Sequence, residues 1–446
     1  MTIRTLLKSS VASLALAITI GASPVLAQDG GTPIPQPKVE NLPVADAAKR
    51  VDLNLPKFSR PTEVTNPLFP ISKQASVLFT GHVDGKPFRT EVTLLPYTRI
   101  VTWQGIQIEA LISQYVAYLD GRVQEVAYDL YAQADDGSVW YFGEDVSDFK
   151  DGVIYTKEGT WLAGKDGPPN MIMPGAPKVG DAFRAENMPG IAFEEVTVSS
   201  IDHTYDGPFG QISGALIGKE LHQDGTYDEK TFAPGYGEVF TGSGGDVEEV
   251  ALAVPADAVS GHLPPELTAL TDGALAIFNA AGAKDWKAAA VSLEAMTAAR
   301  GKLGDGGMPK AVKPLLDEAL KSLIAAVGKR NAGKVRQAAI ETARWSFDLH
   351  LRYRPVAEID LARLDLWAAQ TLLDAAAGDA AMVSHDMFTL MLVRDRILTS
   401  LDAGTVQNLN IQLGELMTAS AGKELDAASE AAGKLREIVA GVKPAQ

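Results

Sequence analysis

Two kinds of sequence meet at His262-Leu263-Pro264-Pro265. Before this junction the chain is rich in aromatic residues and interrupted by Gly and Pro, which is typical of antiparallel β-structure. After it, the chain is rich in Ala, Leu, Lys and Glu, which favour helices. Only seven of the 31 aromatic residues (6 Trp, 11 Tyr and 14 Phe) follow His262. The sequence therefore predicts an α+β protein of two domains.

Turn signals separate short runs of alternating polar and apolar residues before the junction. They are Asp84-Gly85, Asp120-Gly121, Asp135-Asp136-Gly137, Asp151-Gly152, Asp206-Gly207 and Asp224-Gly225. Asp-Gly between alternating runs is the strongest local signal for a β-hairpin. Successive hairpins make a meander, so residues 58–256 are predicted to form an antiparallel β-domain, as a curved sheet, a half-barrel or a sandwich.

Three motifs occur in order within this region. They are Asn66-Pro67-Leu68-Phe69-Pro70, Trp140-Tyr141-Phe142-Gly143-Glu144-Asp145 and Ala233-Pro234-Gly235-Tyr236-Gly237. Together they resemble the recurring motifs of a group of uncharacterised secreted bacterial proteins, over about residues 60–255. The resemblance implies a single β-domain there and brings no functional residue with it.

After the junction, a helical pattern repeats four times around Gly282, Gly328, Gly378 and Gly422, at separations of 46, 50 and 44 residues. One αα-hairpin fits each period, and Gly suits the left-handed residue that follows many helix ends. We predict about eight helices in four hairpins over residues 267–441, as two four-helix bundles or a short solenoid. Residues 257–266 are the predicted linker. The alternative is an accidental likeness among Ala-rich helices.

The first 27 residues are typical of a cleaved secretory signal peptide. Arg4 and Lys8 precede a short apolar run, and Val25-Leu26-Ala27 has the small residues that signal peptidase requires. Cleavage is predicted after Ala27, which implies export to the periplasm or the extracellular space. Residues 28–57 contain several prolines and few apolar residues, so we expect an extended tether.

Two further absences in the sequence narrow the class of protein. After the signal peptide no apolar run reaches the roughly 18 to 20 residues of a membrane-spanning helix. The chain also contains no Cys, which excludes disulfides, thiolate metal sites and Cys nucleophiles.

The negative charge is concentrated in the β-part. Residues 1–261 hold 19 Lys and Arg against 34 Asp and Glu, whereas the remainder holds 21 against 22, for a net charge of -16. Nucleic acid and anionic membranes would be repelled, so neither is expected as a partner. The excess charge can serve solubility alone, or it can form a surface that attracts cations or a basic partner.

A dense polar patch lies between the second and third predicted hairpins. It contains Trp345, Asp348, His350, Arg352, Tyr353, Glu358, Asp360 and Arg363. Pro355 should break the helix here, and spacings of three and four residues place opposite charges on shared helix faces. We interpret the patch as ion pairs across a helix junction. The alternative is a pocket for an anionic ligand, with Arg352 or Arg363 as the clamp and Trp345 and Trp367 as walls.

Metal sites are weakly indicated. The Glu-x-x-His pairs of di-iron bundles and the His-Glu-x-x-His motif are absent. Met and His can hold copper in an exported chain, and Met382, His385, Met387 and Met391 have helical spacing, although a helix core has the same spacing. Calcium is a weaker possibility, because the acidic run at Asp145, Asp148 and Asp151 fits a calcium loop poorly.

No catalytic signature is present, since the chain lacks a Gly-x-Ser-x-Gly elbow and a phosphate-binding loop. Adjacent carboxylates such as Glu194-Glu195 point to opposite faces of a strand, so they do not form an acid-base pair by themselves. Carboxylates distant in sequence can still meet in the fold.

We therefore expect an exported, non-catalytic protein that binds a small molecule or a cell-envelope protein and carries no cofactor. The alternatives are a periplasmic protein that handles copper or iron, and an unrecognised hydrolase. The aromatic residues most suited to line a concave sheet, or to pack its core, are Trp103, Tyr115, Tyr128, Trp140, Tyr141 and Trp161.

Overall fold

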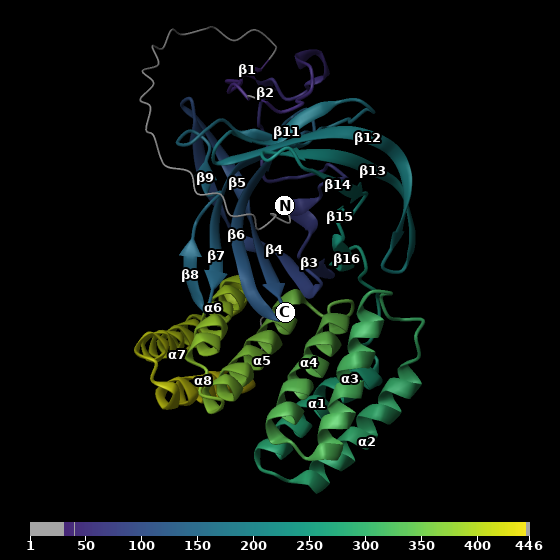
Figure 1. Ribbon diagram of the computed structural model, residues 1–446, viewed down its shortest axis with the longest axis vertical. Coiled ribbons are helices and arrows are strands. Elements are labelled where there is room, and N and C mark those ends of the chain that lie inside the picture. Colours follow the sequence, from purple (N-terminus) through teal and green to yellow (C-terminus); the bar gives the residue numbers. More distant parts are fainter. Residues whose placement is uncertain (1–30, 40, 443–446) are drawn as a thin grey trace.

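A computed structural model describes residues 31–39 and 41–442, and it places a β-layer on a helical layer (Figure 1). The β-layer ends at Val254 and the first helix of the helical layer begins at Pro265. The predicted architecture, an antiparallel sheet followed by eight helices, is confirmed. The predicted signal peptide lies outside the described residues.

The main sheet of the described chain has 14 strands, and every pairing in it is antiparallel. Its order is β10-β7-β6-β5-β4-β3-β16-β15-β14-β13-β12-β11, and β8 and β9 also pair with β7. The strands are β3 (Ser76–Val83), β4 (Lys86–Trp103), β5 (Ile106–Leu119), β6 (Arg122–Gln133), β7 (Val139–Lys150), β8 (Val153–Thr156), β9 (Trp161–Leu162), β10 (Asn170–Met173), β11 (Ala182–Met188), β12 (Ala192–Gly207), β13 (Gly210–His222), β14 (Tyr227–Ala233), β15 (Gly237–Ser243) and β16 (Asp246–Val254).

Most of the predicted turns connect neighbouring strands. Asp84 and Gly85 have φ angles of 53° and 71°, the left-handed pair that a tight hairpin requires. The turn at Gln104-Gly105 has the same conformation and was not predicted. Asp206-Gly207 lies within the end of β12, so that turn falls two residues later than the sequence suggested.

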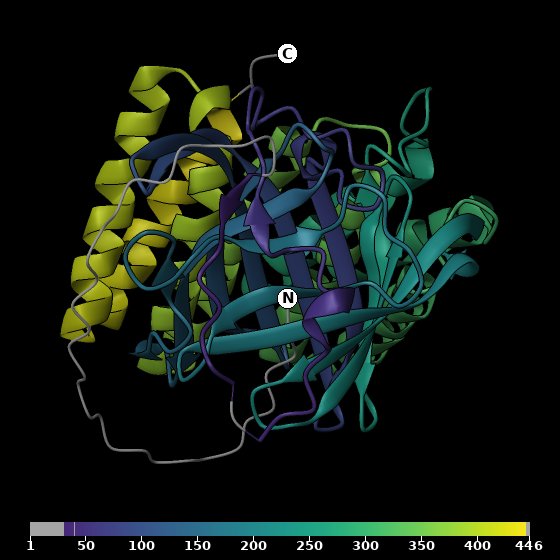
Figure 2. The same cartoon turned by 90° about the horizontal axis from the view of Figure 1, so that it is seen from above.

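The sheet curls away from the helices, so that β11, β12 and β13 cross above the other strands (Figures 1 and 2). Register shifts between Leu94 and Thr98 in β4 and along β12 mark bulges, which bend long strands. The two ends of the sheet come together, where Asn170 Nδ2 in β10 lies 3.4 Å from Met188 Sδ in β11. The sheet therefore has an inner face and an outer face.

The segment before the sheet packs against it rather than forming the expected extended tether. β1 (Thr32–Pro33) pairs with β2 (Asn54–Leu55), and Ile34 and Leu55 are buried in the sheet core. The Asp52 carboxylate binds the Arg50 guanidinium at 2.6 Å and accepts the backbone N–H of Arg184 at 2.8 Å. Buried apolar residues, ion pairs and backbone hydrogen bonds together hold this Pro-containing segment on the sheet.

The helical layer contains eight α-helices in the described chain, in four consecutive hairpins. They are α1 (Pro265–Gly282), α2 (Trp286–Leu303), α3 (Val312–Lys329), α4 (Ala332–His350), α5 (Val356–Ala376), α6 (Ala380–Ile397), α7 (Ala403–Gly422) and α8 (Leu425–Gly441). One hydrophobic core joins α1 to α4 and another joins α5 to α8. The second and third hairpins are separated at Pro355, as predicted.

The repeated glycines play a different role from the one expected. Gly378 alone adopts the left-handed conformation after its helix, with a φ of 81°. In the other three turns the left-handed residues are Lys284, Arg330 and Lys423, while the glycines lie in the last helical turn. In three of the four hairpins, a polar side chain then caps the start of the second helix. These capping residues are Asp285, Asn331 and Asp379.

The helices cover the outer face of the sheet. Val116, Tyr118 and Phe149 of the sheet share a hydrophobic core with α5 to α8, while Leu78 and Leu252 share the core of α1 to α4. The Tyr118 ring stacks on Trp367 with the centroids 5.8 Å apart. The two layers therefore share their cores and form a single packed structure.

Buried ion pairs cross the same interface. Asp348 of α4 binds Arg89 of β4 and Arg363 of α5, each at 2.7 Å. Glu91 of β4 binds Arg396 of α6 at 2.7 Å, and Arg396 also donates to Gln114 Oε1 of β5. We call Arg89, Glu91, Asp348, Asp360, Arg363 and Arg396 the interlayer network. Its three arginines balance its three carboxylates, as buried charges require.

None of the described helices combines the length and the apolar character needed to cross a membrane.

Replacing Asp348 with Asn should destabilise both layers together. The change leaves two buried guanidinium groups without their shared carboxylate, and loss of one partner in a buried pair costs about 3–5 kcal/mol. Chemical denaturation followed by tryptophan fluorescence and circular dichroism should show one transition at lower denaturant. Asp145→Asn, at an exposed ion pair, is the control and should cost at most about 1 kcal/mol. Two separate transitions in the wild type would contradict a shared interface.

Candidate functional site

The inner face of the sheet is the face that the helices do not cover. Along β4, Glu91 points to α6, so the preceding residue, Thr90, points to the inner face. The Thr90 hydroxyl donates to the Glu248 carboxylate of β16, which places Glu248 on the same face. In β5, Gln114 reaches α6, so Ser113 and its cross-strand partner Asp129 also face inward.

Seven buried carboxylates lie on this inner face in the described part of the chain. They are Asp129, Glu144, Glu186, Glu194, Glu220, Asp228 and Glu248. The basic side chains placed among them are Lys230, which is 2% exposed, and His222. Among the residues that the structure describes, carboxylates therefore outnumber basic groups on this face, in contrast to the balanced interlayer network.

The first part of this face combines carboxylates with aromatic rings. Tyr141 donates to Asp129 Oδ1 at 2.7 Å, and Trp161 Nε1 donates to Glu186 at 3.3 Å. The Tyr141 ring stacks on Tyr131 at 4.8 Å and meets Trp161 edge-on at 5.2 Å. Burial, together with the nearby Glu186, raises the pKa of Asp129 to about 7, although the hydrogen bond from Tyr141 lowers it. We call these five residues the aromatic-acid patch.

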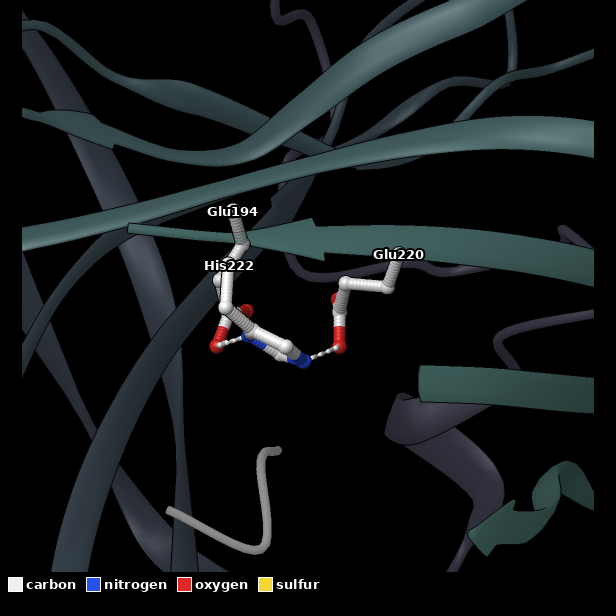
Figure 3. Close-up of side chains that lie close together, drawn as sticks. All are labelled: Glu194, Glu220 and His222. Atoms are coloured by element: carbon white, nitrogen blue, oxygen red, sulfur yellow. Dashed lines mark ion pairs between the residues drawn. The ribbon is translucent and has the colours of Figure 1, made fainter. Parts of the chain in front are cut away.

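The second part is built by three neighbouring strands. Glu220 and His222 are two residues apart in β13 and share a face, Glu194 of β12 pairs with His222, and Asp228 of β14 pairs with Glu220. Figure 3 shows Glu194 and Glu220 on opposite sides of the His222 ring. Lys230 Nζ lies 3.0 Å from Glu220 Oε2.

Carboxylates dominate the electrostatics of this second part. Burial raises the pKa of Glu220 to about 7, and the neighbouring Glu194 adds to the effect while Lys230 opposes it. Burial alone would lower the pKa of His222, but the carboxylates of Asp228, Glu194 and Glu220 raise it overall. An additional positive charge would stabilise the ionised carboxylates.

The charged residues of the predicted polar patch lie mainly in the interface between the layers. Asp348, Asp360 and Arg363 belong to the interlayer network, where Arg363 binds both carboxylates at 2.7 and 2.8 Å. Arg352 donates to the backbone oxygens of Asp257 and Gly307. The guanidinium groups of both candidate clamp residues, Arg352 and Arg363, therefore bind acceptor atoms of the protein itself.

The other residues of that patch are dispersed around the helix junction. Trp345 lies under the Arg89 guanidinium, and Trp367 lies under that of Arg344. His350 Nε2 lies 3.2 Å from the Thr271 hydroxyl, and burial lowers the pKa of His350. Tyr353 and Glu358 are partly buried.

The candidate copper ligands all lie on α6. His385 Nε2 accepts the backbone N–H of Gly152 at 2.9 Å, so this nitrogen holds the β7–β8 turn against the helix. Met387 is buried in the core of α5 to α8, and Met391 packs against that core. Met382 is partly exposed in the first turn of the helix.

The aromatic candidates divide between the two faces of the sheet. Tyr115, Tyr141 and Trp161 face inward, whereas Tyr128 is the cross-strand partner of Gln114 and faces the helices. Trp140 is fully buried and donates to the Ser138 hydroxyl.

The sequence analysis did not identify the inner-face cluster of Glu194, Glu220, His222 and Asp228. The concentration of negative charge in the β-part was its only signal. Glu194 and Glu195 do point to opposite faces, since Glu195 binds Arg184 while Glu194 joins His222. Their partners come from other strands, and pairing register is not visible in one sequence.

Replacing Asp129 with Asn should stabilise the protein increasingly as the pH rises. The pKa of Asp129 is about 7 in the folded protein and near 4 in an unfolded chain, so the folded state binds the extra proton between these values. Stability is therefore lost as the pH rises from about 4 to 7, at up to about 1.4 kcal/mol per pH unit, and the loss levels off above 7, whereas Asn does not titrate. Urea denaturation at pH 5, 6, 7 and 8 measures the difference from wild type. Asp145→Asn should show no such trend, and an equal trend in both variants would contradict the assignment.

Comparison with known proteins assigns neither a family nor a function to the chain. No family model matches the chain, and no curated protein matches it. The functional argument therefore depends on the geometry of the inner face.

Proposed function

We propose that this chain is an exported, non-catalytic binding protein whose inner sheet face binds a cationic small molecule. The observation that carries the proposal is the excess of buried carboxylates over basic groups on that face. Seven buried carboxylates in one region give this face a negative potential. A bound cation would be attracted by this concentration of carboxylates.

The aromatic-acid patch favours an organic cation. Carboxylates attract an ammonium or guanidinium group, and the faces of aromatic rings attract the same groups through their quadrupoles. Asp129 and Glu186 lie beside the rings of Tyr131, Tyr141 and Trp161, so both kinds of contact are available at one place. Phe88, Tyr115 and Val146 form a neighbouring apolar surface that suits the body of such a ligand.

The proposed location in the periplasm or outside the cell is supported by the sequence. A positively charged start, a short apolar run and Val25-Leu26-Ala27 are typical of a signal peptide. The resemblance to uncharacterised secreted bacterial proteins is consistent with this location.

Titration calorimetry with choline, spermidine and arginine ethyl ester tests the proposed function, with acetate as the anionic comparison. At least one cation should bind at one per chain. The variants Asp129→Asn and Glu186→Gln should each weaken that binding by at least tenfold, because each removes one charge from the patch.

The matched controls are Asp145→Asn and Glu63→Gln, which change exposed carboxylates and should bind the same cation as the wild type does. The proposal fails if the cations bind no better than acetate. It also fails if the patch variants and the control variants bind equally.

A further inference from the structure

The imidazole of His222 has carboxylates on both of its sides. Its Nδ1 lies 3.8 Å from Glu194 Oε1, while its Nε2 lies 3.3 Å from Asp228 Oδ2 and 3.7 Å from Glu220 Oε2. The three strands that carry these residues are hydrogen-bonded neighbours, so their backbones hold the side chains together. Among the described residues, Glu194, Glu220 and His222 also bring their ligand atoms within 4.8 Å of one another.

We propose that this cluster binds a divalent transition-metal ion. His222 Nε2, Glu220 and Asp228 are the ligands, and Glu194 is a positioning residue that holds the imidazole through Nδ1. This inference deepens the proposed function, because it also treats the inner face as a surface for cations. It concerns different residues from the aromatic-acid patch.

The distances from His222 Nε2 to the two carboxylates fit one shared ion. Zinc binds imidazole nitrogen and carboxylate oxygen at about 2.0–2.2 Å, so two ligand atoms on one ion lie at most about 4.2–4.4 Å apart. Nε2 lies within this limit of both Asp228 and Glu220. One imidazole with two carboxylates is a donor set that suits zinc, manganese or iron(II).

The arrangement around His222 also matches what metal ligands require. A histidine that binds a metal through one nitrogen usually donates its other N–H to a carboxylate or a carbonyl, which fixes the orientation of the ring. The Glu194 carboxylate lies on that side of the ring, with Oε1 3.8 Å from Nδ1. Side-chain orientation and ligand spacing therefore favour the same assignment.

Glu220 provides a second, independent observation. Its side chain is buried, and within the described chain Oε1 accepts no hydrogen bond while Oε2 faces the Lys230 ammonium and His222 Nε2. His222 Nε2 also makes no hydrogen bond there, despite its ion-pair distances to two carboxylates. Buried polar atoms normally have such partners, so these atoms are suited to a ligand that needs lone pairs.

Lys230 competes for the same site. Its ammonium lies 3.0 Å from Glu220 Oε2 and 3.9 Å from Glu238 Oε2. A metal ion bound to Glu220 would displace the ammonium toward Glu238 or be repelled by it. Removal of the Lys230 charge should therefore strengthen metal binding. If the pair of Lys230 and Glu220 were purely structural, the same change would only destabilise the protein.

Calorimetry at pH 7.5 with zinc chloride and manganese chloride, on protein freed of metal by a chelator, tests this inference. The wild type should bind at least one of the two ions at one per chain. His222→Gln and Glu220→Gln should weaken this binding at least tenfold, Glu194→Gln should weaken it less, and Lys230→Met should strengthen it.

Two exposed residues provide matched controls, His203→Gln in β12 and Glu229→Gln in β14, and both should bind metal as the wild type does. Circular dichroism of each variant checks that it is folded. Lys230→Met tests the site without removing any of the proposed ligands. The inference is overturned if neither ion binds to the wild type, or if the ligand variants bind as the controls do. Organic-cation binding lost in Asp129→Asn and Glu186→Gln would then leave the proposed function standing.

Discussion

The contact between the sheet and the helices depends on a small set of charges that are buried between them. Arg89 and Glu91 extend from β4, and Asp348, Arg363 and Arg396 meet them from three different helices. Burial alone raises the pKa of Asp348, but Arg89 and Arg363 lower it overall, so this carboxylate stays ionised. Because the charges balance, the pairs tolerate removal from water, and they require each helix to lie at a defined position on the sheet.

This constraint also organises the opposite face. Side chains alternate along β4, so the orientation that points Arg89 and Glu91 to the helices points Thr90 to Glu248. The same alternation in β5 separates Gln114, which binds Arg396, from Ser113 and Asp129. A one-residue slip in either strand would exchange the two sets and turn the groups that bind the helices, Arg89, Glu91 and Gln114, to the inner face. The balanced interface and the acidic inner face are therefore two results of one register.

Local sequence was sufficient to predict the elements of this fold. Asp-Gly pairs marked the hairpins because left-handed turn residues have strong preferences, and Pro355 marked the boundary between the second and third helical hairpins. The i,i+3 pair of Asp360 and Arg363 was also predictable, because it lies within one helix. The link from Asp348 to Arg89 was not, since those residues are 259 positions apart. Glu194, Glu220 and His222 likewise meet only through strand pairing, which one sequence does not reveal.

The first and last strands of the main sheet lie side by side at its centre. β3 (Ser76–Val83) pairs with β16 (Asp246–Val254), so the sheet cannot be completed until the 162 residues between them have been organised. Loops of this length are costly to close before their contacts form, and non-local pairing slows folding. Until β16 arrives, β3 keeps an open edge that can pair with other chains. Completion of the sheet therefore depends on one non-local pairing at its middle.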